Sequence, residues 1–117
     1  MKKRASIVAV LGACLILGVA GSAFAGTKTK VTIKEQSGGF YGYVKSNKDK
    51  CSVSRVVALL KQKGNSPKLS RDKVISTDVA QANGDKYMWA ISSSTKGKFY
   101  AYAPKISGCK AGRSKTI

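Results

Sequence analysis

The chain of 117 residues contains no histidine and only five acidic side chains. Histidine is the side chain that most readily exchanges protons near neutral pH, and it is also the commonest metal ligand. No two of the acids are closer than six residues, so no calcium loop of alternating acids is present. We therefore expect a protein that is not an enzyme and that has no catalytic residues, no metal site and no cofactor. The enzymatic alternative is a pair of carboxylates brought together by folding, as in glycosidases.

The first 25 residues have the pattern of a secretory signal peptide. Residues 2–4 are basic, residues 5–20 are uncharged and apolar, and small side chains precede Ala25. This pattern predicts cleavage after Ala25 and a mature chain, residues 26–117, that forms a single domain. We expect the mature protein to be secreted, either extracellular or held in the periplasm or at the cell wall.

Two alternatives exist for this segment. A retained membrane anchor needs about 20 apolar residues, whereas this run is shorter and contains Gly12 and Gly18. The residues before Cys14 resemble a lipobox, which would make Cys14 a lipidated first residue, but residues 15–17 are apolar where a lipoprotein has a polar tether. We predict no transmembrane segment in the mature form.

Two cysteines, Cys51 and Cys109, remain in the predicted mature chain. Because exported proteins meet conditions that permit disulfides, we predict a bond between them. Such a bond closes a loop of 59 residues, and the chain-entropy description assigns it about 4 kcal/mol of stability. The alternative is a reactive or metal-binding pair, to which the chain offers no histidine as a companion.

Hydrophobic residues alternate with a period of two over most of the chain, and turn signals recur between the alternating runs. This pattern is typical of an all-β sandwich or barrel. Strands are expected at residues 31–33, 40–45, 55–61, 74–77, 87–91 and 99–103, with a last strand in the basic tail 110–117.

Residues 53–63 allow two interpretations. Their apolar side chains fit one face of a helix capped by Ser54, but they also fit a buried strand. We predict the strand. Further on, Asn83-Gly84 is the strongest hairpin signal, since a type I′ turn needs positive φ at both central residues. We expect this turn to lead into a strand whose central aromatic residue, Trp89, lies in the core.

Four short segments carry a resemblance to a known family. They are Gly39-Phe40-Tyr41-Gly42-Tyr43-Val44, Arg55-Val56-Val57-Ala58-Leu59, the stretch from Thr77-Asp78 through Asn83-Gly84 to Tyr87-Met88-Trp89, and Gly97-Lys98-Phe99-Tyr100-Ala101. Together they resemble the carboxypeptidase regulatory-like (transthyretin-like, prealbumin-type) β-sandwich domain over most of residues 31–105. The segment from Thr77 to Gly84 is longer than is common in that family, and the spacing from Gly84 to Tyr87 is wider.

The resemblance implies a seven-stranded antiparallel sandwich of Ig-like or prealbumin-like type. Members of this family are usually secreted accessory modules without catalysis, so no active site is carried over to this chain. With the bond between Cys51 and Cys109, the expected fold is all-β with one disulfide.

Positive charge is the main functional signal. Three of the 22 Lys and Arg residues and none of the acids fall in the leader, which leaves 19 cations against five acids and a net charge of +14 for residues 26–117. Sixteen of the 19 are lysines, and they form no run of four. Because arginine is the residue that contacts phosphate and guanine in a bidentate manner, this composition argues against sequence-specific nucleic-acid recognition. The alternative is that the charge only maintains solubility.

Tyrosines alternate with core-type residues in two of the predicted strands. If Phe40, Val44 and Phe99 face the core, the side chains that face the other way include Tyr41, Tyr43, Lys45, Lys98, Tyr100 and Tyr102. Should both strands lie in one sheet, these six residues form one ligand face suited to sugar rings, peptides or bases. The alternative is that the tyrosines are half-buried under loops.

These features predict a secreted, cationic, non-catalytic β-sandwich module. Its expected partner is an anionic polymer, a cell-wall glycan or an acidic protein, unless the module serves a structural role. The alternative function is that of a cationic antimicrobial or toxin-like effector, which would need membrane activity; the chain shows no clear basic amphipathic helix for this unless residues 53–63 are helical.

Overall fold

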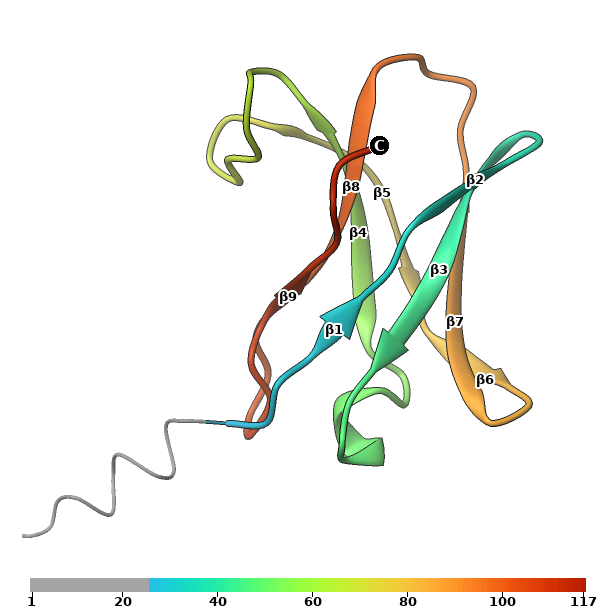
Figure 1. The fold of residues 1–117 in the computed structure, drawn as a ribbon, viewed down its shortest axis with the longest axis vertical. Helices are drawn as coiled ribbons and strands as arrows, with labels where there is room; N and C mark the ends of the chain where they lie inside the picture. Colours follow the sequence, from blue (N-terminus) through green and yellow to red (C-terminus); the bar gives the residue numbers. More distant parts are fainter. Residues whose placement is uncertain (1–25) are drawn as a thin grey trace, which may run out of the picture.

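A computed structural model describes residues 26–117. The predicted signal peptide, residues 1–25, and the predictions about Cys14 therefore lie outside the described residues. The described chain forms nine β-strands in two antiparallel sheets (Figure 1). Within residues 26–117 the structure contains no helix with the length and hydropathy to cross a bilayer.

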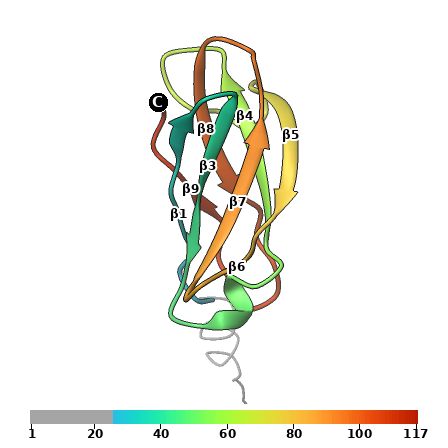
Figure 2. The same ribbon diagram turned by 90° about the vertical axis from the view of Figure 1, so that its right-hand side faces the viewer.

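The first sheet has five strands. Its centre is β3 (Gly39–Lys45) paired with β7 (Lys86–Ser92). On one side, β1 (Lys30–Val31) and β2 (Lys34–Gln36) both pair with β3, and on the other side β6 (Gln81–Asn83) pairs with β7. Figure 2 views this sheet from its outer side.

The second sheet has four strands, in the order β5 (Lys73–Val79), β4 (Val56–Gln62), β8 (Lys98–Ala103) and β9 (Gly112–Arg113). A single turn of 3-10 helix, Asp49–Cys51, connects β3 to β4 across the two sheets. Because β4 covers residues 56–62, the strand predicted at residues 55–61 is confirmed, whereas residues 52–54 form a turn; no helix forms within residues 53–63.

The core lies between the facing sides of the two sheets. Phe40 on β3 and Phe99 on β8 meet with ring centroids 4.8 Å apart, and Trp89 on β7 is fully buried. The predicted core positions are therefore confirmed. The full cluster comprises Val31, Ile33, Phe40, Val44, Val57, Leu59, Ala80, Trp89, Ile91, Phe99, Ala101 and Ala103.

The prediction of seven strands is wrong, because two stretches of extended chain are each interrupted. Between β1 and β2, the carbonyl of Thr32 leaves the ladder and accepts a hydrogen bond of 3.1 Å from the indole nitrogen of Trp89. Between β5 and β6, the chain crosses at Ala80 from the four-stranded sheet to the five-stranded one. The structure therefore has nine strands, because β2 and β6 lie beyond the strands predicted at residues 31–33 and 74–77.

The hairpin predicted at Asn83-Gly84 forms between β6 and β7, but its centre is shifted by one residue. Asn83 pairs with Lys86, so the two central residues are Gly84 and Asp85. Of these two only Gly84 has a positive φ, 66°. A turn with glycine at the first central position matches type II′, so the type I′ prediction is wrong.

Candidate binding face

The predicted disulfide is present. Cys51 and Cys109 are bonded, with Cα atoms 5.5 Å apart, and both side chains are buried. The bond joins the 3-10 turn that follows β3 to the segment between β8 and β9. The prediction of one disulfide is confirmed, and the thiol-based alternatives do not apply to these two residues.

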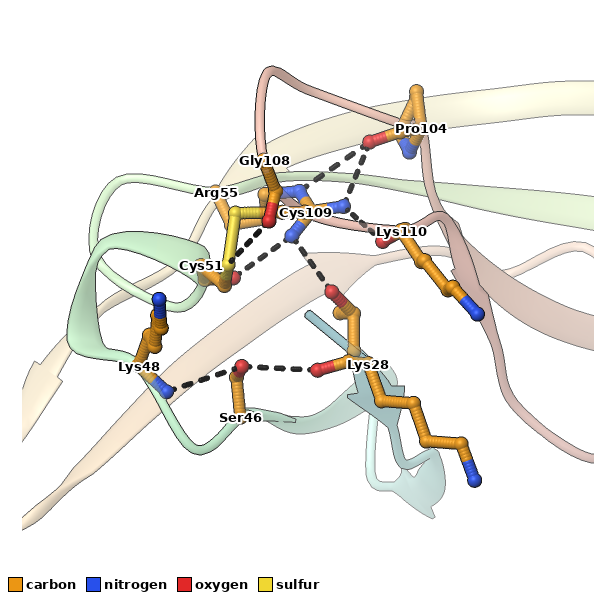
Figure 3. The surroundings of a disulfide bond; sticks show 10 residues. Lys28, Ser46, Lys48, Cys51, Arg55, Pro104, Gly108, Cys109 and Lys110 are labelled. Atoms are coloured by element: carbon orange, nitrogen blue, oxygen red, sulfur yellow. Dashed lines mark hydrogen bonds between the residues drawn. A yellow bond between two sulfur atoms is a disulfide. The ribbon is translucent and has the colours of Figure 1, made fainter. Parts of the chain in front are cut away.

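Arg55 lies next to the disulfide and is 1% exposed (Figure 3). Its guanidinium donates hydrogen bonds to the carbonyls of Cys51 at 2.8 Å, Pro104 at 2.9 Å and Lys110 at 2.8 Å, and to the hydroxyl of Thr29 at 3.0 Å. Among the described residues no carboxylate forms a salt bridge with it. Burial lowers the pKa of Arg55, and its charge interaction with Tyr102 opposes that shift. Arg55 therefore ties three chain segments together and offers no free cation to a ligand.

A second buried polar cluster lies on the outer face of the four-stranded sheet. The Tyr100 hydroxyl donates to a carboxylate oxygen of Asp72 at 2.7 Å, and the backbone N–H groups of Lys63 and Lys68 donate to the same carboxylate. Burial alone would raise the pKa of Asp72, but these hydrogen bonds and one from Arg71 outweigh it and hold that pKa well below its usual range. Burial and the neighbouring Asp72 raise the pKa of Tyr100 to about 12.

The six predicted ligand residues do not lie together. Tyr41, Tyr43 and Lys45 belong to β3 in the five-stranded sheet, whereas Lys98, Tyr100 and Tyr102 belong to β8 in the four-stranded sheet. Since the core-facing side chains alternate with them on each strand, the two groups face outward on opposite sides of the molecule. Tyr100 is fully buried beneath the segment that carries Asp72.

The three residues on β3 form part of a continuous surface on the outer side of the five-stranded sheet. Tyr41 lies opposite Ala90, and Tyr43 lies opposite Met88. The two tyrosine rings stand edge to face, with centroids 6.3 Å apart, and both side chains are half-buried. Their rings supply apolar surface at the middle of the sheet, and their hydroxyl groups can form hydrogen bonds.

Four lysines surround these rings. Lys30 lies opposite Lys45, Lys34 lies opposite Tyr41, and the ammonium of Lys86 sits 5.1 Å from the centroid of the Tyr43 ring. All four lysines are exposed, and none forms a salt bridge with a carboxylate in residues 26–117. We call this surface the tyrosine–lysine face; it consists of Lys30, Lys34, Tyr41, Tyr43, Lys45 and Lys86.

The prediction missed Lys30, Lys34 and Lys86 because they join the face only through strand pairing. Each lies on a different strand from Tyr41 and Tyr43, and only the register of β1, β2 and β7 against β3 brings them beside the tyrosines. No local spacing in the sequence encodes that register. Alternation along residues 40–45 is enough to find the two tyrosines and Lys45.

The chemistry of this face is that of a binding surface. Lysines act as hydrated point charges, and tyrosine rings pack against apolar faces of sugars while their hydroxyls form hydrogen bonds. Tyr41 and Lys45 are four residues apart on one strand, so the face is about 13 Å long in that direction. The described residues contain no group of three or more Cys, Asp and Glu side chains suited to a metal ion.

A cleft of about 440 Å³ lies at another place, between the β2–β3 turn and the β7–β8 loop. Its aromatic residues, Phe40 and Phe99, are 5% and 1% exposed, so they present almost no stacking surface. Among its lining residues, Glu35 and Lys96 are the only charged side chains. This cleft lacks the combination of exposed lysines and half-buried tyrosine rings found on the tyrosine–lysine face.

Comparison of the chain with protein families, with curated proteins and with solved structures found no match.

Proposed function

We propose that the protein is a secreted, non-catalytic binding domain that attaches to an anionic, carbohydrate-containing polymer outside the cell. We also propose that its two-sheet architecture is a sandwich of the carboxypeptidase regulatory-like, prealbumin type. The observation that supports the binding function is the tyrosine–lysine face, where four exposed lysines surround two tyrosine rings on one side of a sheet.

The shape of the face favours a long ligand. An extended strand of such a polymer lying along β3 passes the ring of Tyr41, then that of Tyr43, and ends at Lys45. Lys34 and Lys86 flank this path from the neighbouring strands β2 and β7. Fragments much shorter than about 13 Å reach only one end of the face, so the affinity should rise with chain length until that span is covered.

The experiment compares two double variants that remove the same charge, one from the tyrosine–lysine face and the other from residues outside it. Lys34→Gln with Lys86→Gln alters the tyrosine–lysine face, whereas Lys96→Gln with Lys98→Gln alters exposed lysines of the β7–β8 loop and of β8. Affinity for heparin is measured against salt concentration. We expect the first variant to lose about tenfold in affinity and the second less than about threefold, because only the first removes direct contacts.

Equal losses in the two variants would show that the charge acts only through its general field, which contradicts the proposed site. An affinity of the first variant for heparin equal to that of the unaltered protein at every salt concentration would also contradict the proposed site. Leakage of dye from phosphatidylglycerol vesicles, measured in parallel, tests the effector alternative; for a polymer-binding domain we expect none.

A further inference from the structure

A groove of about 290 Å³ opens at one end of the tyrosine–lysine face. It is lined by Lys28, Lys30, Lys45, Ser46 and Asn47, and we call it the lysine groove. The chain leading into β1 supplies one wall, and the end of β3 supplies the other.

The walls are held together by hydrogen bonds. The hydroxyl of Ser46 donates to the carbonyl of Lys28 at 2.9 Å and accepts a hydrogen bond from the backbone N–H of Lys48 at 3.3 Å (Figure 3). This arrangement fixes the backbone of Lys28 beside the end of β3. The three lysine side chains therefore start from backbone positions that are set before any ligand arrives.

No carboxylate lines the lysine groove itself, although Asp49 and Asp85 line the neighbouring pocket that shares Lys45 and Ser46 with it. Lys30 and Lys45 are directly opposite each other in the β1–β3 pair, a position in which Cβ atoms lie about 5 Å apart and like charges destabilise the sheet. Within residues 26–117, none of Lys28, Lys30 and Lys45 forms a salt bridge with a carboxylate. An anion placed between them would relieve this repulsion.

The donors of the groove fit a phosphate group better than a carboxylate. Lys28 and Lys30 line one wall and Lys45 lines the other, and the Asn47 amide is a further donor on the same lining; the hydroxyl hydrogen of Ser46 is already donated to the carbonyl of Lys28. A tetrahedral phosphate with several charged oxygens can meet donors that come from both walls, whereas the two oxygens of a carboxylate lie in one plane. Lysine binds phosphate as a point charge and needs no fork geometry to do so.

We infer that the lysine groove is a phosphate-binding subsite, so that the polymer held by the tyrosine–lysine face carries phosphodiester groups along its sugar or polyol chain. The inference rests on the proposed function, because Lys30 and Lys45 belong to both the groove and the face. A phospholipid headgroup presents the same phosphate chemistry. We assign the phosphate to a linear polymer because none of the exposed large apolar residues lines the groove, and a membrane-bound surface needs such residues to insert.

The experiment compares two linear polymers of matched length and charge per unit, a poly(glycerol phosphate) and a polygalacturonate. Each is titrated into the purified protein, into a Lys28→Gln with Lys30→Gln variant, and into the Lys96→Gln with Lys98→Gln variant as the charge-matched control. We expect the unaltered protein and the control to bind the phosphate polymer about fivefold more tightly than the carboxylate polymer, and we expect the groove variant to lose that preference. Thermal melts confirm that each variant is folded.

Equal affinity of the unaltered protein for the two polymers would overturn the phosphate subsite while leaving the proposed function intact. A preference that survives in the groove variant would also overturn it. Should a single-stranded oligonucleotide or phosphatidylglycerol vesicles outcompete the poly(glycerol phosphate), the assignment to a polyol or sugar polymer is wrong.

A titration with inorganic phosphate tests the lysine groove independently of the proposed polymer-binding function. If neither polymer binds, the proposed function fails, and the groove is then decided by a titration with phosphate at constant ionic strength, followed by the backbone amide signals of residues 45–47. Saturable shifts confined to these residues and to Lys28 and Lys30 support an anion subsite. Absence of such shifts, or equal shifts at lysines throughout the chain, overturns it.

Discussion

At the residue scale, Arg55 shows why one cation of this basic chain is not available to a ligand. Its planar guanidinium donates to the carbonyls of Cys51, Pro104 and Lys110 and to the hydroxyl of Thr29, which is one acceptor more than the three donors of an ammonium group can serve singly. We predict that Arg55→Met lowers the free energy of unfolding by about 3 kcal/mol or more, because buried carbonyls lose their donors. Chemical denaturation measures this change.

A lysine at the same position provides the control. Arg55→Lys keeps the charge and part of the side-chain volume but supplies fewer well-directed donors, so its stability should fall between those of the unaltered protein and Arg55→Met. A loss of less than about 1 kcal/mol in Arg55→Met would contradict the role assigned to these hydrogen bonds.

Tyr100 makes a distinct prediction about alkaline pH. Its pKa in the folded protein is about 12, compared with an ordinary value of 10.0. Between these values the unfolded chain releases this proton while the folded protein retains it, so stability falls as the pH rises from about 10 to 12 and is fully present below that range. In Tyr100→Phe this part of the decline should disappear, whereas Tyr41→Phe should keep it. Denaturation curves at successive pH values would refute the assignment if both variants behaved alike.

The sequence alone does not predict which of these side chains are buried. Tyr41 and Tyr100 occupy similar places in alternating strands, and nothing in their neighbours shows that one is half-exposed and the other is covered. Tyr100 is covered because Asp72, 28 residues earlier, reaches it from a loop. Arg55 escapes local reasoning for the same reason, since its acceptors lie up to 55 residues away.

At the scale of the elements, Gly42 explains how β1 and β2 come to be separate strands. A Cβ atom at Gly42 would lie 1.8 Å from the carbonyl oxygen of Thr32, which crosses over this position to reach Trp89. Gly42→Ala should therefore displace that carbonyl and lower the free energy of unfolding by about 2–4 kcal/mol.

Gly38 is the matched position for this test. It has a φ of 82°, and a Cβ there would meet nothing within 4 Å, so Gly38→Ala should cost only about 1 kcal/mol for the backbone conformation. If thermal denaturation shows the two alanine variants to be equally stable, the close approach over Gly42 does not constrain the fold.

The disulfide connects two elements that Arg55 also links, through its hydrogen bonds to the carbonyls of Cys51, Pro104 and Lys110. Cys51 and Cys109 are 58 residues apart in sequence, and removing such a cross-link costs about 4 kcal/mol in the chain-entropy description. For the double variant Cys51→Ala with Cys109→Ala, calorimetry should show a Tm lower by about 20 °C. A Tm within a few degrees of the unaltered protein would mean that the surrounding hydrogen bonds of Arg55 suffice without the bond.

For each strand, the sequence predicts well those features that depend on residues close by in the chain. Alternation shows correctly which side chains of β3 and β8 face the core, because it is a property of each strand alone. It does not show that β3 pairs with β7 and β8 with β4, because those contacts join distant segments. The predicted six-residue face failed at this step.

At the scale of the whole molecule, the distribution of charge matters more than its amount. Cationic side chains occur on both sheets, but on the four-stranded sheet Arg71 and Asp72 pair with each other beside the buried Tyr100. On the five-stranded sheet, lysines surround two accessible tyrosine rings and continue into the lysine groove. A diffuse positive field attracts any polyanion, whereas in the proposed function the polymer is held by contacts on this one side of the molecule.

The most direct test of this account maps heparin binding on the protein residue by residue. Heparin oligosaccharides long enough to span the face are titrated into the isotopically labelled protein, and backbone and side-chain NMR signals are followed. We predict saturable shifts at Lys34, Tyr41, Tyr43 and Lys86, with the signals of Lys98 and Tyr102 unchanged. Shifts centred on β8, or spread evenly over lysines of both sheets, would contradict the claim that the tyrosine–lysine face is the binding site.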